Sequence, residues 1–142
     1  MEFIKALKSA VSKQRRRSGT RAYYSGGEIY LSRLYAYILK DGRYEPDPRY
    51  SDHIKTIFTL LAAGKTLPEV KSALDEMKAR DSSNNRYSYA RIMALVRPIY
   101  AGFIEQRGKL VEVKNMTPIV SLEIYRKAER QLRVERKKLV AQ

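Results

Sequence analysis

Most apolar residues of this chain recur with the spacing of amphipathic helices, one every three or four positions along a single helical face. Five segments show the pattern. They carry Phe3, Ile4, Leu7 and Val11; Ile54, Ile57, Phe58 and Leu61; Leu67, Val70, Leu74 and Met77; Tyr89, Ile92, Met93 and Val96; and Leu122, Tyr125, Ala128 and Leu132. The sequence therefore predicts a mainly helical protein. Its core should include Ile57, Phe58, Leu61, Val70, Leu74, Ile92 and Val96.

Residues typical of helix ends bound several of these segments. Gly64 is suited to a left-handed C-terminal cap, and Thr66 with Glu69 forms a capping box in which Pro68 is tolerated in the first turn. Ser88 and Ser121 stand where the third and last helices of the main domain should begin, and the second helix should continue to about Arg80.

The apolar period changes in two places. Residues 103–105 and 110–113 flank the polar sequence Gln106-Arg107-Gly108-Lys109, which predicts a short β-hairpin at about 103–113. Residues 28–39 (EIYLSRLYAYIL) are apolar and rich in tyrosine, and their pattern fits either a helix or a strand. We favour a helix for this segment.

The prolines and glycine of residues 41–48 indicate a turn followed by an extended segment, a candidate hinge. We therefore divide the chain into a basic helical arm and linker, residues 1–45, and a helical domain, residues 46–142, with the hairpin and a long basic C-terminal helix. The expected fold class is mainly α with a small β-hairpin: a helix-turn-helix or winged-helix-like core preceded by a basic helical arm.

Composition narrows the chemistry. The 142 residues include no cysteine and one histidine, His53, which excludes disulfides and thiolate zinc sites. The apolar runs are far shorter than the ~20 residues that a membrane span requires. We expect no metal, no cofactor and no membrane contact, and a location in the cytoplasm, associated with the nucleoid, or in a virion.

Net charge points to the partner. Lysine and arginine total 29 against 15 aspartates and glutamates, a formal net charge of +14. Binding of such a chain to a polyphosphate releases condensed counterions, so double-stranded DNA is the expected partner. The sequence leaves open whether the protein forms a homo-oligomer on DNA.

The candidate DNA-binding residues form three groups. The arm supplies Lys13, Arg15, Arg16, Arg17, Arg21 and Tyr23 for phosphate and sugar contact; the loop and first turn of the third main-domain helix supply Asn84, Asn85, Arg86, Ser88 and Arg91; the hairpin tip supplies Arg107 and Lys109. Asparagine pairs well with adenine and arginine with guanine, so the second group could read bases, while a basic hairpin tip could follow the backbone or the minor groove.

From Asp47 onward the chain resembles the DNA-binding recombinase domain of the large serine recombinases, the phage integrase and resolvase group. Three landmarks in order carry the resemblance, namely EPDPRYSDHIKTIFTLLAAGKTLPEVKSALDEM (residues 45–77), SYARIMALVRPIYAG (residues 88–102) and TPIVSLEIY (residues 117–125). Arg97 stands where the family usually has asparagine. The resemblance implies binding of one half of an attachment-like site, without the catalytic domain or zinc ribbon of a full-length serine DNA recombinase.

No residues suggest catalysis, and we expect no enzymatic activity from this chain on its own. Asp75 and Glu76 are adjacent on a helix and so diverge by about 100°, and Ser12 and Ser18 have only the arm arginines beside them. A second reading is a structural nucleoprotein that coats DNA, such as a helical-bundle virion or chromatin protein. The hairpin at 103–113 separates the two readings, because a pure helical bundle would lack it.

Overall fold

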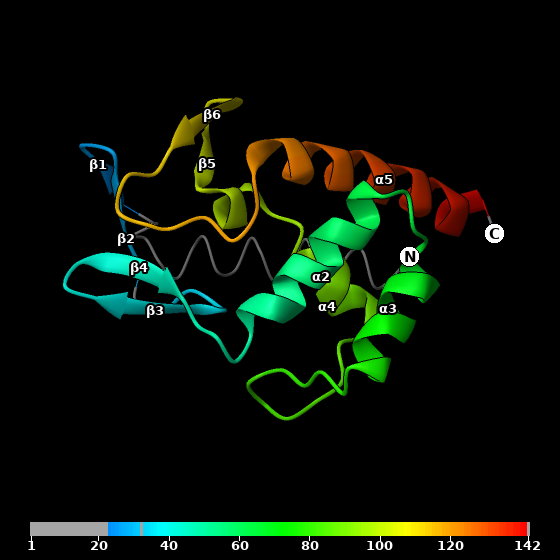
Figure 1. Cartoon of the computed structure of the whole chain (residues 1–142). Helices are drawn as coiled ribbons and strands as arrows, with labels where there is room; N and C mark the ends of the chain where they lie inside the picture. Colours follow the sequence, from blue (N-terminus) through cyan, green and yellow to red (C-terminus); the bar gives the residue numbers. More distant parts are fainter. Residues whose placement is uncertain (1–22, 32, 142) are drawn as a thin grey trace.

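The computed structural model describes residues 23–31 and 33–141, and it places four helices, one 3₁₀ turn and three two-stranded hairpins along that part of the chain (Figure 1). In order the elements are β1 (Tyr23–Ser25), β2 (Glu28–Tyr30), β3 (Tyr37–Lys40), β4 (Arg43–Pro46), α2 (Ser51–Ala62), α3 (Leu67–Glu76), α4 (Tyr89–Ala94), η1 (Pro98–Ala101), β5 (Phe103–Gln106), β6 (Lys109–Glu112) and α5 (Leu122–Ala141). The helix expected over 3–11 lies outside the described residues.

Helix α2 forms the centre of the helical part, with α5 on one side and α3 on the other (Figure 1). The ring of Phe58 lies 6.2 Å from that of Tyr125 and 6.3 Å from that of Tyr100, centroid to centroid. Farther along, Gln131 Nε2 donates hydrogen bonds to the backbone oxygens of Gly64 and Lys65. Helices α2 and α5 therefore advance in the same direction.

The predicted helix signals are confirmed where they depend on local chemistry. The Thr66 hydroxyl accepts from the backbone N–H of Glu69, whose carboxylate accepts in return from the Thr66 N–H. Ser88 and Ser121 accept from the backbone N–H groups three residues on, and Gly64 has a left-handed φ of 85°. The three hydroxyls satisfy N–H groups that a helix N-terminus leaves without intrahelical partners.

A buried carboxylate adds a cap that the sequence did not reveal. Glu135 of α5 is 5% exposed, and its Oε1 accepts a 2.7 Å hydrogen bond from the backbone N–H of Leu67, the first residue of α3. Lys138 Nζ lies 3.0 Å from the other carboxylate oxygen. The negative charge thus sits at the positive end of the α3 dipole, where it is stabilising.

The core prediction is confirmed for Ile57, Phe58, Leu61, Val70, Leu74 and Ile92, all buried, and Val96 packs half-buried against them. Tyr125 is buried as expected, and Tyr100 is buried as well. Two inward assignments are wrong: Met77 is 44% and Tyr89 43% exposed. Helix α3 ends at Glu76 rather than near Arg80, so Met77 leaves the helical face, and Tyr89 lies under the ammonium group of Lys71 at the surface.

The helix favoured over 28–39 is wrong, because this segment contributes strands to two hairpins. Strand β1 pairs with β2 and β3 pairs with β4, both antiparallel. Each turn has positive φ at both central residues, Gly26-Gly27 in the first and Asp41-Gly42 in the second. That geometry matches the twist of paired strands and favours glycine, aspartate or asparagine.

The hairpin predicted at 103–113 is confirmed as β5–β6, with Phe103 opposite Glu112 and Gln106 opposite Lys109. Its turn again has two positive φ values, at Arg107 and Gly108. A pure helical bundle would lack this hairpin, so its presence disfavours that fold. The fold is thus helical with three hairpins rather than one. No helix in the part of the chain that the structure describes is long and apolar enough to cross a membrane.

The side chain of Asn115 joins the hairpins to the rest of the molecule. Its Oδ1 accepts from the backbone N–H of Ile29 at 2.9 Å, and its Nδ2 donates to the backbone oxygens of Ile29 at 2.9 Å and Gly42 at 3.1 Å. The backbone oxygen of Asn115 accepts from the Tyr44 N–H at 2.8 Å. Ile29, Tyr37 and Tyr44 consequently belong to the same buried cluster as the helices.

Candidate nucleic-acid interface

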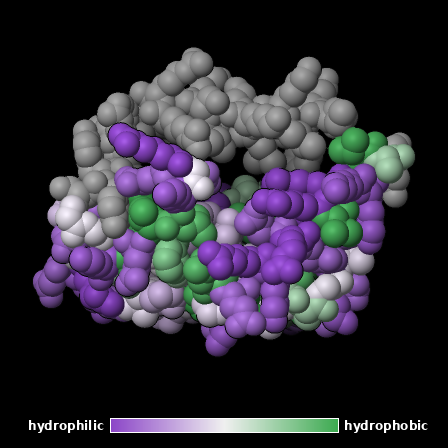
Figure 2. Space-filling view, turned by 90° about the horizontal axis from the view of Figure 1, so that it is seen from above, coloured by the Kyte–Doolittle hydropathy of each residue, from purple (hydrophilic) through white to green (hydrophobic). Residues whose placement is uncertain are grey.

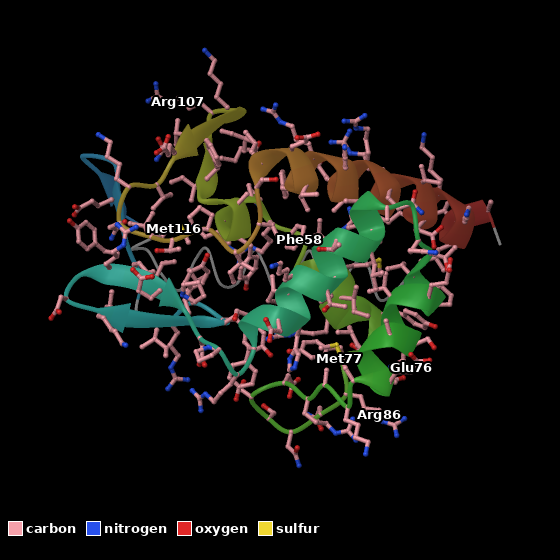
Figure 3. The ribbon with its side chains drawn as sticks, viewed as in Figure 1. Phe58, Glu76, Met77, Arg86, Arg107 and Met116 are labelled. Atoms are coloured by element: carbon pink, nitrogen blue, oxygen red, sulfur yellow. The ribbon has the colours of Figure 1, made fainter. Side chains whose placement is uncertain are left out.

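The loop between α3 and α4 presents three of the predicted residues to solvent, and Asp81 organises it. The Asp81 carboxylate accepts from the backbone N–H groups of Ser83 at 2.8 Å and Asn85 at 3.0 Å, and its own N–H donates to the Asn85 oxygen at 2.9 Å. Asn84 adopts a φ of 62°, in the left-handed region that asparagine tolerates best after glycine. The loop is therefore a hydrogen-bonded structure in which Asn84, Asn85 and Arg86, directly before α4 in the sequence, are exposed. Figure 3 shows Arg86 at the lower edge of the molecule.

The other two predicted residues at this end have roles within the protein. The Ser88 hydroxyl caps α4 by accepting from the Arg91 N–H at 3.1 Å. The guanidinium carbon of Arg91 lies 4.5 Å from the centre of the Tyr35 ring, a cation–π contact. Arg91 Nε is buried without a hydrogen-bond partner among the described residues, and no described carboxylate forms an ion pair with this half-buried cation.

An aromatic cluster behind α4, which the sequence reasoning missed, positions the loop. Tyr87 is 1% exposed, and its hydroxyl hydrogen-bonds both the Tyr35 hydroxyl and, at 2.9 Å, Nδ1 of His53. Lys71 Nζ donates to the Tyr87 backbone oxygen at 2.9 Å. Burial raises the pKa of the Tyr87 hydroxyl and lowers the pKa of His53, so both groups are neutral at pH 7.

His53, the single histidine of the chain, is half-buried in this cluster at the start of α2. Tyr50 completes the cluster, with its ring 5.4 Å from Tyr35 and 6.2 Å from His53. The only hint in the sequence was the excess of tyrosine. No spacing rule relates residues so far apart along the chain.

The hairpin tip carries Arg107 and Lys109, both exposed. Figure 3 shows Arg107 at the top of the molecule beside β5 and β6, and Arg86 at the bottom, beyond α3. The structure therefore does not bring these two predicted groups to one surface.

The arm group falls largely outside the description of the structure. Lys13, Arg15, Arg16, Arg17 and Arg21 lie outside the described residues, and of Tyr23 only the backbone, in β1, is described. Within the described residues no group of three or more histidine, aspartate or glutamate side chains could hold a metal ion.

Comparison with known proteins identifies the family. The family model described as Recombinase matches residues 48–135, more than half of the chain. The protein belongs to the Recombinase family. No curated protein matches the sequence.

Two solved structures share the fold. One is described as the crystal structure of an LSR–DNA complex, where LSR denotes a large serine recombinase. It is 13% identical to this chain with a TM-score of 0.57, and the match covers 89% of this chain and 38% of the chain in that structure. The other comes from work on the sequence requirements of the Listeria innocua prophage attP site. It is 13% identical with a TM-score of 0.56, and the match covers 88% of this chain and 50% of the chain in that structure. The present chain thus spans half or less of the length of each.

Proposed function

We propose that this chain is a DNA-binding domain that acts in DNA recombination, in a phage or other mobile element. Membership of the Recombinase family supports the process, and the likeness to structures of recombinases with DNA or studied with a prophage attachment site supports the partner. The net charge of +14 agrees with a polyphosphate ligand. We propose no catalytic step for this chain by itself.

We further propose that the loop before α4 reads the bases of one half-site. The observation that carries this is the loop built on Asp81, because it presents exposed Asn84, Asn85 and Arg86 on a backbone held by hydrogen bonds. Side chains held in position recognise base edges with a smaller loss of conformational entropy. Arg91, held against Tyr35, is a half-buried cation suited to a phosphate beside the reading loop.

Replacement of Arg86 tests this reading function. We expect Arg86→Ala to weaken binding to a preferred duplex by about 1–3 kcal/mol and to relax its sequence preference. Affinity for a scrambled duplex of equal length and composition should fall much less. The measurement is a pair of fluorescence titrations, with the preferred duplex first obtained by selection from a random pool.

Lys55→Ala is the matched control, since Lys55 is an exposed cation on α2 with no ion pair in the described part of the chain. It should alter both titrations equally and little. If Arg86→Ala also weakens the two duplexes by the same factor, Arg86 contributes only charge and the loop does not read sequence.

The arm is proposed to supply sequence-independent affinity. Changing Lys13, Arg15, Arg16 and Arg17 together to alanine should weaken binding to every duplex and flatten the slope of log K against log salt by up to roughly three units. Each phosphate contact that is lost reduces the number of counterions released on binding. The slope of log K against log salt measures that number. An unchanged slope would remove the arm from the interface.

A further inference from the structure

The outward face of α5 carries a row of cations that the candidate site does not include. Arg126, Arg130, Arg133 and Lys137 fall within about 60° of the helix circumference, at 100° per residue, and all are exposed. The residues that α5 buries lie roughly on the opposite side of the helix; they are Tyr125, Ala128, Leu132 and Glu135. The row spans about 16 Å along the helix.

Most of this charge has no ion-pair partner among the described residues. Arg133 pairs with Glu129, but no carboxylate of the described residues lies within ion-pair distance of Arg126, Arg130 or Lys137. The whole helix contains seven basic and three acidic residues. Like charges in such a row repel one another, and a polyanion laid along the row would remove that repulsion.

This row lies on the opposite side of the molecule from the reading loop. Helix α5 packs on α2 and reaches α3 at its first residue, Leu67. The reading loop follows the other end of α3, so nitrogen-tipped side chains stand above α5 while Arg86 lies below α3 (Figures 1 and 3). Figure 2, which views this upper face, shows mostly hydrophilic residues with smaller hydrophobic patches between them. Arg107 at the hairpin tip belongs to the same upper face.

We propose that the outward face of α5 binds the phosphate backbone of a second segment of duplex DNA, so that one domain bridges two segments. This inference rests on the proposed function, because it assumes that the loop before α4 holds the first segment. One duplex strand carries a phosphate about every 3.4 Å along the axis. A row of about 16 Å can therefore follow four or five phosphates of one strand, without contact to base edges.

The experiment uses two duplexes at once. A biotinylated preferred duplex is fixed to beads, the full chain is bound, and a fluorescent duplex of unrelated sequence is added; the retained fluorescence measures bridging. We expect the wild-type protein to retain the second duplex, and Arg126→Ala/Arg130→Ala/Lys137→Ala to reduce retention at least about tenfold. Its affinity for a single preferred duplex in solution should change by less than about threefold, because the reading loop is intact.

The control variant Arg33→Ala/Lys40→Ala/Lys55→Ala removes the same number of exposed cations from elsewhere and should retain the second duplex. Sedimentation of the free protein at the same concentration should show a monomer, so that bridging is not due to dimers. A wild-type protein that binds no duplex would refute the proposed function. Binding of one duplex without retention of a second would overturn only the bridging inference. Equal loss in the control variant, or loss of single-duplex affinity in the α5 variant, would overturn it too.

Discussion

Phe58→Ala should lower the free energy of unfolding by about 3–5 kcal/mol. Phe58 is fully buried in α2, and its ring lies against Tyr100 of η1 and Tyr125 of α5. Three separate elements line the space that the ring fills. Because these elements cannot all move inward to fill the space, a cavity remains. The cost of this cavity adds to the transfer free energy that is lost with the ring.

Unfolding in urea, followed by circular dichroism, measures this effect. Met77→Ala is the control, because Met77 follows α3 and is 44% exposed; its effect should stay within about 0.5 kcal/mol. A loss below about 1 kcal/mol for Phe58→Ala would be inconsistent with the packing of α2 against η1 and α5.

The second large effect is expected at Asn115. Asn115→Ala removes the partner of three backbone groups at once, the N–H and oxygen of Ile29 and the oxygen of Gly42. A buried polar group left unsatisfied costs about 1–3 kcal/mol, so the variant should lose at least about 3 kcal/mol of unfolding free energy. The position is 6% exposed, which leaves water little access to replace the amide.

Hydrogen exchange separates this local role from a general loss of stability. In Asn115→Ala the amides of Ile29 and Tyr44 should exchange faster than in the wild type by a larger factor than the amides of α2. Asn85→Ala is the matched control: Asn85 is an exposed asparagine whose loop hydrogen bonds use its backbone. Uniform acceleration across the whole chain in Asn115→Ala would show that the amide does not specifically hold the hairpins.

The helices of the main domain could be predicted because their determinants are local. The apolar spacing of α2, α3 and α5 sets the buried face, and the hydroxyls of Thr66, Ser88 and Ser121 cap N–H groups three residues away. Such interactions depend on residues within one turn of each other. The hairpin β5–β6 was predictable for the same reason, since a polar turn containing glycine separates two short apolar runs.

The strands within residues 28–39 could not be predicted in this way. Their apolar pattern suits a helix as well as a strand, and what decides between them is contact with a segment more than seventy residues later. Asn115 supplies both a donor and an acceptor to Ile29, as a neighbouring strand would. A helix would have met its backbone hydrogen bonds internally and left that amide buried without partners.

For the candidate site, the sequence by itself determined which cations and asparagines are exposed in the loop before α4 and at the hairpin tip. Local polarity and turn chemistry are sufficient for that. Only the tertiary structure decided that the Tyr35 ring contacts the guanidinium group of Arg91 and that Tyr87, next to the loop, hydrogen-bonds His53. It also decided that Arg86 and Arg107 lie on opposite sides of the molecule. These relations join residues that lie far apart along the chain, and they follow from the packing of one buried cluster that includes residues of the hairpins and of the helices. That packing minimises exposed apolar surface over the whole chain, and no short window of sequence contains it.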